Sequence, residues 1–131
     1  MSLQGYQYVV LRCVPRVERE EFVNVGVVLY SQAADFLEAR YDVDEERLRA
    51  LAPGLDADLV HDALETLCRV CRGETGGGLP DLGSLGRRFG WISAPRSTVV
   101  QPGPVHGGLT GDPRSELEGL VRRLVGRPDR G

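Results

Sequence analysis

The chain has 131 residues, of which 41% are hydrophobic, so it has the size of one ordinary domain and can bury a modest core. Its formal net charge is -3 and its isoelectric point is about 5.4, opposite in sign to the basic surface of nucleic-acid-binding domains, so we expect no nucleic-acid binding. All 16 basic residues are arginine, and the absence of lysine excludes Schiff-base catalysis, pyridoxal phosphate attachment and a lysine-dependent phosphate-binding loop.

The first third of the chain predicts three antiparallel strands. Residues 6–14 (YQYVVLRCV) are rich in β-branched and aromatic side chains and stop before Pro15, which would interrupt a strand ladder. Residues 21–30 (EFVNVGVVLY) are apolar on both faces, which is typical of a central strand, and we expect them to form an antiparallel hairpin with the first strand. Residues 36–41 (FLEARY) alternate after a turn and predict a third strand beside the second.

The remainder of the chain predicts helices that pack on this sheet. Asp44 is a suitable N-cap for a short helix over residues 45–51. Asp56 can begin a longer helix over residues 57–72, in which apolar side chains recur at helical spacing. A capping aspartate followed by a proline begins the last helix, residues 113–125.

Between the long helix and the last helix the local signals are weaker. Residues 82–89 suggest a short helix, residues 91–101 suggest another strand, and His106 lies among glycines and prolines that predict a loop. The whole chain, residues 1–131, therefore predicts a single α+β domain. Its small antiparallel sheet would come from the N-terminal strands, with three or so helices packed on it.

Cys68 and Cys71 form a C-x-x-C pair, but we interpret them as packing residues. Structural zinc needs four ligands, and the only other soft donors are Cys13, His61 and His106. His61 and Cys68 would lie roughly 10 Å apart on the helix, which is too far for one ion to bridge. Redox thiols are usually placed at a helix N-terminus, whereas these stand in the last turns. We expect no metal and no cofactor.

The chain also carries no signal for a membrane. No apolar run approaches the roughly 18 residues that a membrane-spanning helix needs. The first residues lack the basic segment and apolar stretch of a secretory signal, and three cysteines are too few for a disulfide framework. We therefore expect a cytoplasmic protein that does not bind a membrane.

The most informative polar cluster lies in the predicted hairpin and comprises Arg12, Glu21, Asn24 and Gly26. Strict alternation puts Asn24 in an apolar strand, where a buried amide needs hydrogen-bond partners, and Gly26 leaves room for a backbone or a ligand. Two interpretations stay open. Asn24 fixes the strand register while Arg12 and Glu21 form an ion pair, or the cluster binds a ligand or a partner.

The same alternation divides the predicted strand at residues 21–30 into two faces. One face carries Val23, Val25, Val27 and Leu29, and the other carries Phe22, Asn24, Gly26, Val28 and Tyr30.

At these residues the chain resembles a known family. Residues 8–15 (YVVLRCVP) and 21–29 (EFVNVGVVL) resemble the opening signature of the uncharacterised bacterial family catalogued as domain of unknown function 3037. The resemblance continues through residues 48–51, the predicted helix at 56–72, residues 94–96 and the last helix. It implies no established activity. It does imply a protein partner, because genes of such proteins stand beside a gene for a HipA-like kinase.

We therefore expect an interaction or accessory protein, with a HipA-like kinase as its partner. The alternative is a small enzyme in which Arg12 orients an anionic substrate while Glu21 and Asn24 supply acid-base and hydrogen-bonding groups. The two hypotheses differ in whether the cluster lines a concave pocket or is occupied by internal hydrogen bonds.

Overall fold

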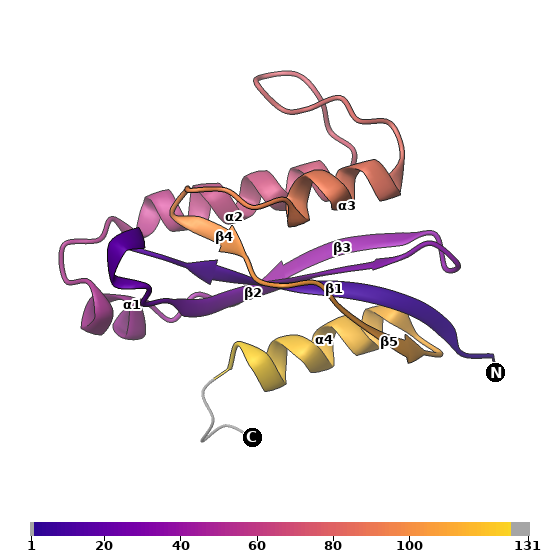
Figure 1. The fold of residues 1–131 in the computed structure, drawn as a ribbon, viewed down its shortest axis with the longest axis horizontal. Helices are drawn as coiled ribbons and strands as arrows, with labels where there is room; N and C mark the ends of the chain where they lie inside the picture. Colours follow the sequence, from indigo (N-terminus) through magenta and orange to yellow (C-terminus); the bar gives the residue numbers. More distant parts are fainter. Residues whose placement is uncertain (1, 127–131) are drawn as a thin grey trace.

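Residues 2–126 are described by a computed structural model, in which helices cover both faces of a five-stranded antiparallel sheet (Figure 1). The sheet order is β3-β2-β1-β4, and β5 pairs with the other half of the same edge of β1. The elements are β1 (Gln4–Cys13), the 3-10 turn η1 (Val17–Arg19), β2 (Val23–Ser31), β3 (Phe36–Tyr41), α1 (Glu45–Leu51), α2 (Ala57–Cys71), α3 (Leu85–Ser93), β4 (Val100–Pro102), β5 (His106–Thr110) and α4 (Pro113–Leu124). The predicted α+β class is confirmed, while residues 1 and 127–131 of the predicted domain lie outside the described part.

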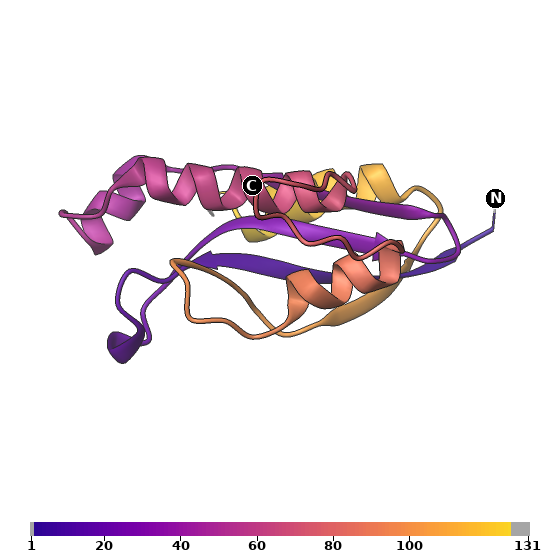
Figure 2. The ribbon, with the colours of Figure 1, turned by 90° about the horizontal axis from the view of Figure 1, so that it is seen from above.

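Strand β1 divides the apolar core into two layers because its side chains alternate. Val9, Leu11 and Cys13 are buried against α2 and α3, whereas Tyr6 and Tyr8 pack in the layer of α4. Figure 1 shows α2 and α3 on one side of the sheet and α4 on the other, and Figure 2 shows the same molecule from above. The sheet is therefore the middle of three layers.

The predicted hairpin of the first two strands is confirmed, but its assignment of faces is wrong. Leu11 pairs with Gly26 while Arg12 pairs with Asn24, so Val25 is an extra residue in β2 and forms a β-bulge. Beyond the bulge the alternation is shifted by one residue. Val23, Val25 and Val28 thus face α2 and α3, while Val27 and Leu29 face α4. An apolar run offers no sequence contrast from which to locate such a shift.

The predicted helices are confirmed, with ends that differ by one residue for α2 and α4. Each begins at a side-chain cap. Asp44, Asp56 and Asp112 accept hydrogen bonds from backbone N–H groups of their first turns, and Ser84 does the same for α3. No helix within residues 2–126 combines the length and the apolar character needed to cross a membrane.

The segment between α2 and α4 differs from its prediction. The helix expected over residues 82–89 extends from Leu85 to Ser93, and the strand expected within residues 91–101 is reduced to Val100–Pro102. The loop expected around His106 is wrong, since this residue begins β5. Glycine and proline weaken local strand preference there, but pairing with the N-terminal half of β1 overrides it.

Two leucines of α2 that differ in burial, Leu64 and Leu59, provide a test of this packing. Leu64 is fully buried, so Leu64→Ala is expected to lower the free energy of unfolding by about 2 to 5 kcal/mol through lost transfer energy and a residual cavity. Leu59 is 57% exposed, and Leu59→Ala is expected to change it by less than about 0.5 kcal/mol. Urea denaturation followed by circular dichroism measures both. Equal losses for the two variants would contradict the packing described.

Candidate functional site

The predicted cluster lies at the bulged end of the β1–β2 hairpin. Arg12 and Asn24 stand directly opposite each other on the two strands, and their side chains share the face of α4. The guanidinium carbon of Arg12 lies 4.2 Å from the ring centroid of Phe22, which is 45% exposed. A Cβ atom at Gly103 would lie 3.1 Å from the Arg12 guanidinium, so glycine in the β4–β5 connection leaves room for this stacked arrangement.

Asn24 holds the end of α4 against the sheet. The last carbonyl groups of a helix have no partners within the helix. Asn24 Nδ2 donates to the backbone oxygen of Leu124 at 3.0 Å, and Arg47 Nη1 donates to that of Val125 at 3.2 Å. The expectation that the amide of Asn24 needs partners is thus met by its nitrogen. Its Oδ1 and the Nε of Arg12 are buried without a hydrogen-bond partner among residues 2–126.

Gly26 is required by the neighbouring strand. A Cβ atom there would come within 2.9 Å of the backbone oxygen of Arg40 and 3.0 Å of the Cβ of Tyr41. Real Cβ atoms avoid such distances, so any side chain at this position would push β3 away from the bulge. The sequence left open whether a backbone or a ligand comes close to Gly26, and the structure shows that it is the backbone of β3.

Glu21 is separated from the other members of the cluster. The expected ion pair between Arg12 and Glu21 is wrong, since Glu21 pairs with Arg19 instead. The hydrogen bond from Arg19 lowers the pKa of the Glu21 carboxyl from its ordinary value. Glu21 lines an open groove of about 660 Å³ between the β1–β2 connection and the α1–α2 loop. Its other lining residues are Pro15, Arg16, Arg19, Ala50, Leu51, Ala52, Pro53, Gly54 and Leu55.

A row of aromatic rings on the α4 face was not singled out from the sequence. The ring centroids of Tyr6 and Tyr8 lie 6.1 Å apart, and those of Tyr8 and His106 lie 5.2 Å apart. Burial and the nearby Glu116 raise the pKa of Tyr6. The alternation of Tyr6 and Tyr8 in β1 was the available signal. The third ring, that of His106, belongs to β5, a strand that the sequence did not predict.

Comparison with known proteins gives one match. The model of the family DUF3037, described as a protein of unknown function, matches residues 8–125. The chain belongs to this family. No curated protein and no solved structure matches it. The span shared with DUF3037 includes Arg12, Glu21, Asn24 and Gly26, and it ends at Val125, whose carbonyl group Arg47 binds.

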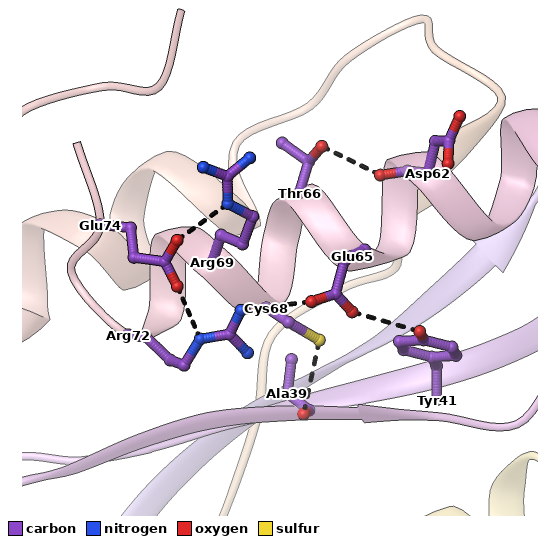
Figure 3. A network of polar contacts seen from close by, with 9 residues as sticks. All are labelled: Ala39, Tyr41, Asp62, Glu65, Thr66, Cys68, Arg69, Arg72 and Glu74. Atoms are coloured by element: carbon purple, nitrogen blue, oxygen red, sulfur yellow. Dashed lines mark hydrogen bonds and ion pairs between the residues drawn. The ribbon is translucent and has the colours of Figure 1, made fainter. Parts of the chain in front are cut away.

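The cysteines of this DUF3037 chain are free and buried. Cys68 Sγ donates to the backbone oxygen of Ala39 at 3.8 Å, so it links α2 to β3. Figure 3 shows this contact within a polar network in which Glu65 accepts from Tyr41 and Arg72. In the same network Glu74 accepts from Arg69 and Arg72. Within residues 2–126 no three His, Cys, Asp or Glu side chains are grouped to hold a metal ion.

The bond between Asn24 and α4 predicts a local loss of stability in the DUF3037 chain. Asn24→Ala leaves the Leu124 carbonyl without this donor and is expected to lower the free energy of unfolding by about 1 to 3 kcal/mol. Amides of α4 should also exchange with deuterium faster than in the unmodified chain. Gln4→Ala is the control, because the Gln4 side chain donates one long, exposed bond to Ala33 O. Unchanged exchange in α4 would exclude the proposed role of Asn24.

The buried thiols predict a loss of stability at high pH. Burial raises the pKa of Cys13 and Cys68 to about 11 and that of Cys71 to about 12. An unfolded thiol has a pKa of about 8.5. As the pH rises, the unfolded state therefore loses these protons before the folded state does. The contribution of the cysteines to stability is complete below about pH 8 and is lost progressively toward about pH 11.

Urea denaturation at pH 8 and pH 10 measures this loss. Cys71→Ala should show a smaller decrease between the two pH values than the unmodified chain, since it lacks one of the titrating groups. At pH 8 the native thiols should also react with Ellman's reagent only after unfolding. Fast reaction of the native protein would show that the thiols are accessible.

Proposed function

We propose that this chain is an accessory protein that binds a partner protein through the exposed end of its first hairpin. This hairpin-end surface consists of Arg12, Phe22 and the connection at residues 14–21. Figure 2 shows the connection projecting beyond the end of the sheet, where it borders a groove with the α1–α2 loop. The observation that carries the proposal is the exposed Phe22 ring with the guanidinium of Arg12 stacked on it.

A half-buried arginine stacked on an exposed aromatic ring has the properties of a binding hot spot. Arginine and aromatic residues are enriched at the centres of protein interfaces, where a few of them account for most of the binding energy. Stacking on Phe22 already restricts the Arg12 side chain, so less conformational entropy is lost on binding. The arginines of the connection are paired within the chain, Arg16 with Glu18 and Arg19 with Glu21. Recognition would therefore depend on this stack rather than on a basic patch.

A HipA-like kinase is the partner that we propose. The gene neighbourhood implied by the family resemblance supports this choice. The three free thiols agree with a reducing compartment, and we propose the cytoplasm as the place where the two proteins meet.

The enzyme hypothesis receives less support from the geometry. Glu21 is bound by Arg19, and the amide nitrogen of Asn24 is bound to the carbonyl of Leu124. Arg12 does not line the groove that contains Glu21. The groups that a substrate would need are thus either occupied or separated, and binding of a protein surface remains the better supported function.

Co-expression with a HipA-like kinase tests the proposal. The two proteins should elute as one complex in size-exclusion chromatography. Phe22→Ala should weaken the affinity measured by calorimetry at least tenfold, because truncating a hot-spot aromatic costs about 2 kcal/mol or more. Arg12→Lys, which keeps the charge but loses the planar stack, should act in the same direction.

Leu3→Ala is the matched control. Leu3 is 65% exposed at the opposite end of β1, so its truncation should leave the affinity within twofold of the unmodified chain. The melting temperature of each variant shows whether the fold is intact. Separate elution of the two proteins at micromolar concentration would exclude the complex. Equal affinities of the Phe22 and Leu3 variants would exclude the hairpin-end surface as the binding site.

A further inference from the structure

The outer strands β3 and β5 differ in how their edges are protected. At β3, α2 packs along the strand, with Cys68 Sγ bound to the oxygen of Ala39 and Tyr41 bound to Glu65 (Figure 3). Within residues 2–126, β5 pairs with β1 and with no other strand. An open strand edge presents unpaired N–H and C=O groups and can bind another strand.

The hydrogen bonds of β1 show which groups of β5 face outward. The oxygen of Val10 accepts from Gly103 N, and Val14 N donates to the oxygen of Val99, so even-numbered residues of β1 turn their backbone groups toward β4 and β5. Tyr6 is one of these and pairs with Gly108. The backbone groups alternate along β5 as well, so those of Gly107 and Leu109 point away from β1.

The two outward positions differ in size, since Leu109 is large and Gly107 has no side chain, so a leucine from a second copy could fit over the glycine. Leu109 is 66% exposed, and it shares a face of the sheet with Gly107. Gly107 has no positive φ, and a Cβ atom there would make only an ordinary contact of 3.4 Å with the oxygen of Tyr6. Nothing among the described residues therefore requires glycine at this position. Gly108 differs, since a Cβ atom there would lie 2.6 Å from the hydroxyl of Tyr6.

The edge also lacks the charges that usually prevent strand association. Residues 97–111 contain no Asp, Glu, Lys or Arg, although such residues make up 27% of the chain. Natural edge strands are commonly protected by charged side chains, by proline within the strand or by a covering element. An uncharged edge favours an uncharged strand as its occupant, and a second β5 has this property.

We propose that the chain forms a dimer in which β5 pairs with β5 of a second copy, antiparallel about a two-fold axis at Gly108. In this register Gly107 of one copy exchanges backbone hydrogen bonds with Leu109 of the other. Leu109 then extends over Gly107 of the second copy, where no side chain stands in its way. One sheet continues through both copies, with the two α4 helices on the same face. The proposal is independent of partner binding, which uses the opposite end of β1.

Sedimentation velocity over a range of protein concentrations tests the dimer. The interface is smaller than standard interfaces, so we expect a dissociation constant on the order of 10–100 µM. Both copies carry a net charge of -3, so added salt should strengthen the dimer or leave it unchanged. Leu109→Pro removes an outward N–H and should weaken the dimer more than tenfold, whereas Leu109→Ile keeps the N–H and should retain it. A chain that stays monomeric at several hundred micromolar would overturn the proposal, as would a proline variant that dimerises normally.

Cross-linking tests the register and does not depend on the proline variant. Gly107→Cys and Leu109→Cys are prepared separately, mixed, and treated with a short bifunctional thiol reagent. The mixture should give a covalent dimer, because these residues face each other across the axis, while each variant alone should give several-fold less. The native cysteines are buried and serve as the background in the unmodified chain. Efficient cross-linking of Gly107→Cys alone, or none in the mixture, would overturn the proposed pairing.

Discussion

Strand β1 is the element on which both apolar layers depend. It pairs with β2 along one edge and with β4 and β5 along the other. Its strict alternation directs aliphatic side chains to α2 and α3 and aromatic side chains to α4. A residue added to or removed from this strand would exchange its two sets of side chains between the layers. The helices can be placed only because this alternation is uninterrupted from Gln4 to Cys13.

The bulge in β2 converts this regular frame into a specific surface. The extra residue, Val25, brings Asn24 to the face of α4, opposite Arg12. Asn24 then reaches the last carbonyl of α4, and Phe22 comes to lie under the Arg12 guanidinium. One local irregularity thus both fixes the end of a helix and presents the arginine–aromatic stack at the exposed end of the hairpin. β-Bulges are often found where a strand must redirect a side chain.

The parts of the fold that could be predicted from the sequence are those with a local signal. The capped helices, the hairpin and β3 were predicted because caps, turns and alternation act over a few residues. The bulge was missed because Val25 stands in a run that is apolar on both faces. Strand β5 was missed because its glycines favour a loop, and only pairing with β1 makes the segment a strand. The ion pair of Glu21 was assigned wrongly since three arginines lie within reach in sequence, and only the turn η1 selects Arg19.

The pairing of β1 with β5 has a consequence for how the chain is made. Gln4 lies opposite Thr110, so β1 must wait for a segment made much later before this part of its outer edge is paired. Until then the N-terminal half of β1 can pair only with β2, and the aromatic side of the sheet has no α4 to cover it. Contacts between residues so distant in sequence form slowly, and exposed edges are open to wrong partners meanwhile. The nascent chain is thus most vulnerable to aggregation in the interval when β1 is complete but β5 has not yet emerged.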